Sequence, residues 1–303
     1  MDELTGVILV VNVGSSSLKL GLFDGRAERE FAREEVTWGS HQDQDADALR
    51  HGIRSLLARH GHMSVAAVGH RVVHGSDRYS ASVLIDETVK RDIRDLSALA
   101  PLHNPKALAI IEAVEALMPG ISQVATFDTA FHATMAPAAY LYPLPYHWYE
   151  AWGIRRFGFH GLSHAYCAGR SADLVGRPLD EKRLVVCHLG AGCSLAAIHQ
   201  GRSVATTMGF TPLDGVPMAT RPGTLDPGIL LHLLRSGRLS VDEAERALDA
   251  DSGLRGLSGL TGDMRELLAA RTAGNERARL ALEIFTARVR EGIGALAVAL
   301  GGL

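Results

Sequence analysis

The chain has 303 residues, of which 47% are hydrophobic and 21% charged, and its formal net charge is −3. This length is sufficient for two domains, and the composition is that of an ordinary water-soluble globular protein. Because the net charge is slightly negative, there is no electrostatic basis for binding nucleic acid or an anionic membrane, and we expect neither partner.

Cysteine usage and hydropathy predict a cytoplasmic protein. Cys167, Cys187 and Cys193 form no CxxC pair and have no metal-ligand spacing with histidine, so we expect free thiols in a reducing compartment. The apolar run 7–11 is short and follows acidic residues, unlike a secretory signal. No run approaches the roughly 20 apolar residues that span a bilayer.

The first predicted elements are two strands within residues 7–23, joined by the loop 14–17 of sequence GSSS. A tight hairpin needs only two turn residues such as Asn-Gly. Here Asn12 precedes a glycine and three hydroxyls, and Lys19 follows them. These groups favour a site for an anion, with an ordinary polar loop as the alternative.

The next predicted elements alternate between helix and strand. The pattern predicts a helix at 45–60, a buried strand at 66–75, an amphipathic helix at 105–120 and a short strand at 122–132. Residues 137–153 are rich in proline and aromatic side chains. We expect no regular element there, but a covering flap or an interdomain loop.

Residues 183–204 repeat the pattern of the first hairpin, with an apolar strand, the polar His188, a glycine-containing turn and a second apolar strand. This repetition predicts a duplicated α/β unit, one per domain, with a ligand between the halves. Helices are then expected at 226–236, 241–250, 262–271 and 275–300, the last of them with Asn275 as its N-cap.

Nine stretches of the sequence, in order, resemble the acetate kinase family. They are NVGSSSLKL (12–20), GHRVVHG (69–75), APLHNP (100–105), FDTAFH (127–132), RRFGFHGLSH (155–164), HLGAGCS (188–194), MGFTPLDG (208–215), TRPGTLDPG (220–228) and SGLTGDMRE (258–266). The resemblance implies an α/β protein with the actin-like, ribonuclease H-like ATPase fold, made of duplicated βββαβαβα-type units with a cleft between them. The N-terminal domain would span 1–135 and the second domain 136–303.

The resemblance also implies an activity: transfer of the γ-phosphoryl group between ATP and a short carboxylate, with Mg²⁺ or Mn²⁺, forming an acyl phosphate. Such a transfer needs in-line positioning and cations around the moving oxygens, with little covalent help. Arginines are suited to bringing the two anions together. Acetate is the expected acceptor, and propionate and butyrate are the alternatives.

By this resemblance, Arg71 binds the acceptor carboxylate, while Arg221 and His160 stabilise the migrating phosphoryl group. Asp128 helps to hold the magnesium and to orient the reactants. Outside their motifs, a histidine and a strand-end aspartate of this kind equally serve as packing and capping residues. The alkyl group of the acceptor would lie among four apolar residues that are otherwise ordinary core positions: Val73, Leu102, Phe159 and Pro212.

The nucleotide is assigned in the same way to the two hairpins and one later stretch. Asn12 would lie on the metal side of the phosphates. Loop N–H groups and hydroxyls can hold phosphate, and glycines allow close backbone contact. The nucleotide-binding residues would be Ser15, Ser17, Lys19, His188, Leu189, Gly190, Ala191, Gly192, Asp263, Met264 and Arg265. Four further histidines are expected to be structural: His74, His103, His132 and His164.

The sequence departs from the family pattern at Ala191, where asparagine is usual, and at Pro222 and Thr224, where many members carry serine and aspartate. We expect these changes to tune activity. Family members continue beyond residue 303 with a glycine-rich adenosine loop, a glutamate for the metal and a final helix. The alternative is therefore a truncated, non-catalytic nucleotide-binding relative. The resemblance also implies a homodimer, joined through the second domain.

Overall fold

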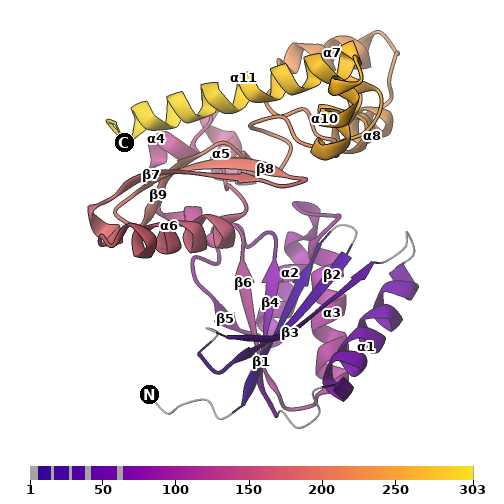
Figure 1. Ribbon diagram of the computed structural model, residues 1–303, viewed down its shortest axis with the longest axis vertical. Coiled ribbons are helices and arrows are strands. Elements are labelled where there is room, and N and C mark those ends of the chain that lie inside the picture. The colour runs from indigo at the N-terminus through magenta and orange to yellow at the C-terminus, as the bar shows by residue number, and fades with distance from the viewer. Residues whose placement is uncertain (1–5, 15–16, 27–28, 38–41, 60–63, 303) are drawn as a thin grey trace. The chain divides into compact units, whose positions relative to one another are not determined.

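A computed structural model gives the fold. It describes five stretches of the chain, with only the backbone for 36–37 and 42–49: residues 6–14, 17–26, 29–37, 42–59 and 64–302. The chain divides into two compact units, Met1–Ala130 and Phe131–Leu303 (Figure 1). The sequence-based division lies after residue 135.

The first unit is built around a six-stranded mixed sheet with the strand order β3-β2-β1-β4-β6-β5. Strands β1, β4 and β6 are parallel, while β2, β3 and β5 run antiparallel to their neighbours. The strands are β1 (Val7–Val13), β2 (Ser17–Asp24), β3 (Glu30–Thr37), β4 (Val65–Val72), β5 (Val83–Leu84) and β6 (Ser122–Phe127). The helices are α1 (Gln42–Arg59), α2 (Glu87–Asp95), the 3-10 turn Leu96–Ala98 and α3 (Asn104–Leu117).

The core of the first unit follows from the alternation of side chains along its strands. In β1, every second residue is fully buried, Leu9 and Val11 among them. These residues belong to one apolar cluster with Ile53 of α1 and Val114 of α3. The two helices lie side by side against the sheet (Figure 1). Because β1, β4 and β6 are parallel, their carboxyl ends meet at one edge of the sheet.

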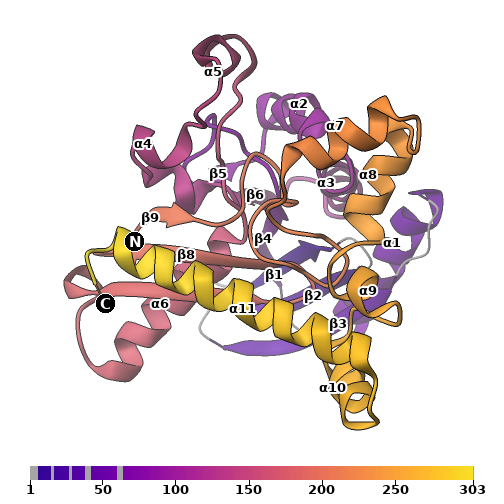
Figure 2. The same cartoon turned by 90° about the horizontal axis from the view of Figure 1, so that it is seen from above.

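The second unit contains a three-stranded antiparallel sheet with the order β7-β8-β9, and two helices cover it. Helix α11 packs across one face and α6 packs on the other (Figures 1 and 2). The strands are β7 (Arg183–Leu189), β8 (Cys193–His199) and β9 (Arg202–Thr206). The helices are α4 (Pro137–Tyr140), α5 (Tyr146–Trp152), α6 (Gly161–Val175), α7 (Pro227–Arg235), α8 (Val241–Ala250), α9 (Gly253–Ser258), α10 (Met264–Thr272) and α11 (Glu276–Ala299), and 3-10 turns span Ala130–Thr134 and Leu179–Glu181.

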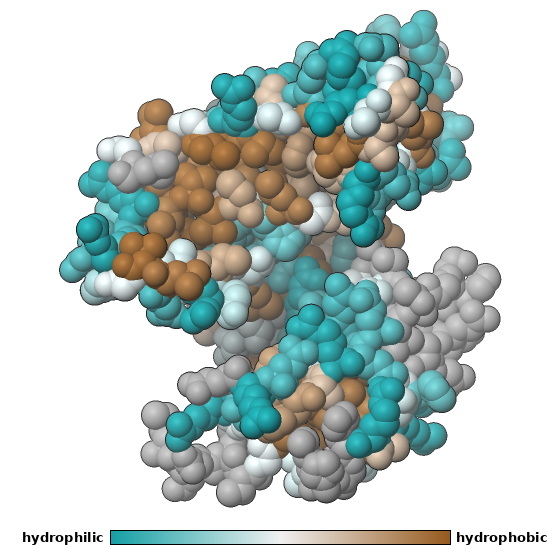
Figure 3. Space-filling model, viewed as in Figure 1, coloured by the Kyte–Doolittle hydropathy of each residue, from teal (hydrophilic) through white to brown (hydrophobic). Residues whose placement is uncertain are grey.

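The two units share the repeated element expected from the sequence. Each has an antiparallel three-stranded meander, β1–β2–β3 in the first unit and β7–β8–β9 in the second. In the described part of the second unit, β7 pairs only with β8, whereas β1 pairs on both sides. Apolar side chains gather over the second unit between α11 and α6 (Figure 3). None of the described helices, including the 24-residue α11, has an apolar run long enough to cross a membrane.

The expectation for residues 137–153 is wrong in one respect, because α4 and α5 are regular helices within this segment. The three prolines of this segment avoid helix interiors: Pro137 lies in the first turn of α4, Pro143 between the two helices, and Pro145 immediately before α5. Gly153 then ends α5 in the left-handed conformation. The other expected helices and strands are present with shifted ends.

Two buried histidines of the first unit make its stability depend on pH. His70 and His74 are 2% and 0% exposed. Burial lowers the pKa of each from 6.5 to about 4, and for His70 a hydrogen bond with Gln123 opposes this effect only in part. Both side chains are therefore neutral in the folded protein at neutral pH.

We expect the free energy of unfolding to fall as the pH drops from 6.5 towards 4, because only the unfolded chain then protonates these histidines. The loss is about 3 kcal/mol per histidine at most. Urea unfolding of the full chain at several pH values measures it. In the variants His70→Gln and His74→Asn, the amide side chain can replace one hydrogen bond of the histidine ring, but it does not titrate. The double variant should flatten the dependence between pH 6.5 and 5, and an unchanged slope would contradict the assignment.

Candidate active site

The carboxyl ends of β1, β4 and β6 bring three predicted site residues together in the first unit. Asn12 and Arg71 are paired positions in the register of β1 and β4, and Asp128 directly follows β6. Arg71 Nη1 donates to Asn12 Oδ1 at 3.1 Å. Its Nε and Nη2 donate to the two carboxylate oxygens of Asp128 at 3.0 and 2.6 Å.

This cluster is a buried ion pair. Asp128 is 1% exposed, and the guanidinium forms a bidentate contact with its carboxylate, the strongest geometry for such a pair. Burial opposes the charged form of Arg71, but the charge of Asp128 and its hydrogen bonds outweigh burial and raise the pKa of Arg71. Arg71 is therefore charged, and its contacts with Asp128 hold the two side chains in place.

The cluster also limits what Arg71 can offer to a ligand. A guanidinium has five N–H donors. Besides the contacts to Asn12 and Asp128, Arg71 Nη1 also lies 3.4 Å from the carbonyl oxygen of Val13. Most of its donors are therefore directed at the protein. Binding a carboxylate through two parallel hydrogen bonds requires one of these partners to release Arg71.

The residues assigned to the alkyl group of the acceptor occupy different environments. Val73 is buried, whereas Leu102 is 55% exposed. Their segments lie side by side, because the side chain of Asn104 accepts from the His74 backbone N–H at 3.1 Å and donates to its carbonyl oxygen at 3.0 Å. In the second unit, Phe159 is fully buried.

The serine loop is described in part. Ser15 lies outside the described residues. Ser17 donates its hydroxyl to Glu35 Oε1 at 2.9 Å, and Lys19 Nζ lies 3.8 Å from the same oxygen. Both side chains therefore point to one face of β2, as residues two apart on a strand do. An exposed pair of this kind contributes about 1 kcal/mol or less, so Glu35 holds Lys19 only weakly.

A second cluster of predicted residues forms around the β7–β8 hairpin in the second unit. His160 has a left-handed backbone (φ 58°) directly before α6. Its ring stacks on that of His188 with the centroids 4.1 Å apart. His188 Nδ1 in turn lies 2.8 Å from Ser163 Oγ. A left-handed conformation is strained for a residue other than glycine, so the surrounding packing maintains it.

Gly192 at this hairpin lies directly beside His160 and Arg221. A Cβ at Gly192 would be 2.7 Å from Arg221 Nη2 and 3.2 Å from His160 Nε2. A side chain there would displace the end of the Arg221 side chain and crowd the His160 ring, which glycine avoids. The carbonyl oxygen of Pro212 accepts from Arg221 Nη1 at 2.9 Å. Glycine at this position thus allows a guanidinium and an imidazole nitrogen to lie close to the hairpin backbone.

Arg221 differs from Arg71 in its electrostatics. Arg221 forms no ion pair with any residue that the structure describes. Burial lowers its pKa, and the charge of Asp249 offsets this only in part. Arg221 is partly buried, and removing a cation from water without a bonded anion is costly. An anion bound beside Arg221 would therefore be stabilised.

The stretch at 263–265 is connected to the hairpin through backbone contacts. The carbonyl oxygen of Ala191 accepts from the N–H of Ala219, and a Cβ at Gly262 would lie 2.7 Å from the carbonyl oxygen of Ala219. Asp263 caps α10, accepting from the backbone N–H groups of the next turn. Its hydrogen bonds with Arg265 lower the pKa of Asp263 to about 2. Asp263 therefore has a structural role besides any contact with a ligand.

Sequence reasoning missed Ser194 and treated His164 as structural. Ser194 Oγ is buried, 2.9 Å from His160 Nδ1 and 2.7 Å from His164 Nε2. The signal was present, since His160 and His164 are four residues apart and therefore face the same side of a helical turn. Ser194 also belongs to the hairpin motif.

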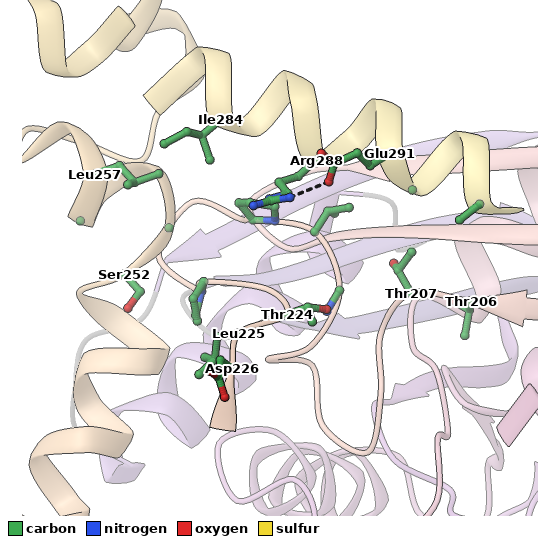
Figure 4. A pocket seen from close by; sticks show the side chains of 18 of the residues that line it. Thr206, Thr207, Thr224, Leu225, Asp226, Ser252, Leu257, Ile284, Arg288 and Glu291 are labelled. Atoms are coloured by element: carbon green, nitrogen blue, oxygen red, sulfur yellow. Dashed lines mark hydrogen bonds and ion pairs between the residues drawn. The ribbon is translucent and has the colours of Figure 1, made fainter. Parts of the chain in front are cut away.

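A separate cavity of about 1110 Å³ lies in the second unit (Figure 4). Helix α11 lines it with Ile284, Arg288 and Glu291, and Arg288 donates to Glu291 at 2.7 Å. Thr224 and Asp226 line it from the loop before α7. Its described lining includes none of the residues predicted for catalysis or for binding, so it is distinct from the hairpin cluster.

Solved structures define the class of protein. The chain matches the crystal structure of Porphyromonas gingivalis acetate kinase with a TM-score of 0.88 and 35% identity, covering 98% of this chain and 81% of that one. It matches a propionate kinase from Francisella tularensis subsp. tularensis SCHU S4 with a TM-score of 0.88 and 34% identity, over 97% of this chain and 80% of that one. The fold is the actin-like ATPase fold, as expected from the sequence.

Sequence comparison defines the family. A profile of the Acetokinase family matches residues 32–303. The acetate kinase of Synechococcus sp. (strain JA-2-3B'a(2-13)) is 49% identical over 329 aligned residues, covering 98% of this chain and 81% of that protein. That of Gloeobacter violaceus (strain ATCC 29082 / PCC 7421) is 46% identical with the same coverage of both. The chain belongs to the acetokinase family.

Proposed function

We propose that the chain is an acetate kinase, which transfers the γ-phosphoryl group of ATP reversibly to acetate and forms acetyl phosphate and ADP. Family membership supports the reaction. The single structural observation that carries it is the close approach of Arg221 Nη2 and His160 Nε2 to one backbone position, Gly192. Two nitrogens gathered at one point suit the oxygens of a phosphoryl group in transfer when both donate.

Arg221 and His160 are the catalytic residues of this proposal. The transfer is direct and in line, because the acetate carboxylate is already a nucleophilic anion and no strong base is required. Arg221 donates to the migrating phosphoryl oxygens and neutralises their charge, and the His160 Nε2–H donates to another of them. Both groups act by positioning and electrostatic stabilisation, which dominate phosphoryl transfer.

The acceptor carboxylate is assigned to Arg71. Asp128 orients the Arg71 guanidinium through the bidentate contact, and Arg71 binds the carboxylate with the donors that its present partners leave or release. The alkyl group of the acceptor contacts Val73, Leu102, Phe159 and Pro212. The size of these side chains sets the preference for chain length, since one methylene is worth about 1–3 kcal/mol.

Family membership implies ATP as a substrate together with a divalent metal ion, and we infer that this ion is Mg²⁺. Mg²⁺ prefers oxygen ligands and is commonly bound through one or two carboxylates plus substrate phosphates. Asn12 Oδ1 and the Asp128 carboxylate offer such oxygens, both now occupied by Arg71. The residues thus fit the ion chemically. When bound, the ion neutralises phosphate charge.

The nucleotide is assigned to groups that can hold phosphate and adenosine. Ser15, Ser17 and Lys19 supply hydroxyls and a point charge for the phosphates. The hairpin supplies backbone contacts through His188, Leu189, Gly190, Ala191 and Gly192. Asp263, Met264 and Arg265 contact the adenosine. We infer further that the protein is cytoplasmic and forms a homodimer.

A hydroxamate assay for acyl phosphate tests the function. We expect acetyl phosphate from ATP, acetate and Mg²⁺, with kcat/KM falling from acetate to propionate and butyrate. The match to the Francisella propionate kinase favours propionate as the second candidate. A higher kcat/KM with propionate would transfer the assignment to that acid. Binding of ATP without any acyl phosphate from the three acids would support the non-catalytic alternative and contradict the proposal.

A further inference from the structure

A single hydroxyl joins two histidines at the centre of the second unit. Ser194, the second residue of β8, is completely buried. Its Oγ lies 2.9 Å from His160 Nδ1 and 2.7 Å from His164 Nε2. A serine hydroxyl carries one proton and can accept on its remaining lone pairs. It therefore donates to no more than one of the two rings.

The geometry leaves the three side chains little freedom. His160 directly precedes α6 and His164 lies in its first turn, and both rings reach Ser194. Ser194 is held in β8, whose residues 193–198 are all buried. The ring of His160 is also fixed by stacking on His188. The proton arrangement among these groups is therefore set by hydrogen bonds and not by rotation of the rings.

We propose that Ser194 is a positioning residue that selects the tautomer of His160. In this arrangement, Ser194 donates its hydroxyl proton to His160 Nδ1 and accepts a proton from His164 Nε2–H. His160 Nδ1 is then an acceptor, so the proton of the neutral ring is on Nε2. His160 Nε2 is the nitrogen beside Gly192, where Arg221 Nη2 also lies.

The reverse arrangement would place the proton on His160 Nδ1 and a lone pair on Nε2. A lone pair directed at a phosphoryl oxygen repels it, whereas an N–H donates to it. The hydrogen bond on one ring nitrogen thus determines what the other can do. Ser194 acts through His160 and does not touch the reacting atoms. The functional consequence rests on the role proposed for His160 above, whereas the tautomer itself does not.

Long-range ¹H–¹⁵N spectra of the full chain with ¹⁵N-labelled histidine measure the tautomers directly. The spectra are recorded at about pH 8, where an imidazole of ordinary pKa is neutral. His160→Gln and His164→Gln identify the signals. We expect the Nε2–H pattern for both rings in the unmodified chain. A His160 signal with the Nδ1–H pattern would overturn the proposal, whether or not the protein is active.

Substitution of the serine gives the second part of the test. Ser194→Ala should convert the His160 signal into a mixture of tautomers, and Ser194→Thr, which keeps the hydroxyl, should restore the Nε2–H pattern. In the acyl phosphate assay, Ser194→Ala should lower kcat by about 10- to 100-fold, the usual effect of losing a hydrogen bond that orients a functional group. The KM values for ATP and acetate should change little, because binding is not altered.

Ser203→Ala is the matched control. Ser203 Oγ is equally buried and lies 2.8 Å from His132 Nδ1, so this variant also removes one buried serine–histidine hydrogen bond. It should lose similar stability while the His160 tautomer is retained. Equal changes of the His160 signal in both alanine variants would show a general packing effect and contradict the assignment. An unchanged His160 tautomer in Ser194→Ala would also contradict the assignment of Ser194 as the residue that selects it.

Discussion

Replacing Arg221 by alanine should lower kcat by about 10³- to 10⁵-fold, the range known for arginines that stabilise phosphoryl transfer. This corresponds to about 4–7 kcal/mol of lost transition-state stabilisation. The reason is electrostatic: Arg221 is a partly buried cation without an ion-pair partner among the described residues, and its Nη2 lies beside Gly192 near His160 Nε2. Steady-state kinetics in the acyl phosphate assay measure the loss.

Arg221→Lys and Arg156→Ala separate charge from folding in this experiment. Lysine keeps the charge but lacks the planar pair of donors, so it should recover only part of the rate. Arg156 is also partly buried in the second unit, where it pairs with Asp214 at 3.3 Å. Its removal should reduce stability with a much smaller effect on kcat. If Arg221→Ala retains kcat within about tenfold, the catalytic role of Arg221 is wrong.

Replacing Arg71 by alanine should have two effects, one on the acceptor and one on stability. The KM for acetate should rise and kcat/KM should fall, because the carboxylate loses its cationic partner. The free energy of unfolding should fall by about 3–5 kcal/mol, since the buried carboxylate of Asp128 is left without its ion pair. Acetate titrations and urea unfolding measure the two effects independently.

Two further variants distinguish these effects. Arg71→Ala combined with Asp128→Asn removes the unpaired charge and should recover part of the stability, but not the acetate KM. Arg78→Ala removes a half-exposed pair with Asp92 at 2.9 Å and should cost about 1 kcal/mol or less without affecting acetate. If the acetate KM of Arg71→Ala is normal, Arg71 does not bind the acceptor.

Several elements follow from local sequence alone. Strands β1 and β8 and helix α8 begin and end close to the residues expected. Helix α11 begins after its expected N-cap, Asn275. They are determined by side-chain periodicity and by caps, which act within a few residues. The sequence reading did not find β3, where the three consecutive charged residues Arg33, Glu34 and Glu35 interrupt any alternation with apolar residues. The local preference of this segment for a strand is weak, and its pairing with β2 makes it one.

The site was predictable only as a set of residues. The motifs identified Arg71, Asp128, His160 and Arg221, but not their contacts. Arg71 and Asp128 are 57 residues apart in the chain, and only the register of three parallel strands brings their charges together. That pairing also shows how few donors Arg71 has available, which composition and motif spacing do not reveal.

The sequence by itself determined the family, the helices and strands with strong periodicity, and the identity of the charged and glycine residues in the motifs. Only the tertiary structure decided which atoms of these residues meet. The direction of Ser194 towards two histidines and the approach of Arg221 to Gly192 depend on strand register, on the pleat of β8 and on loop paths. These are long-range properties, because a side chain's partners are set by chain segments far away in sequence.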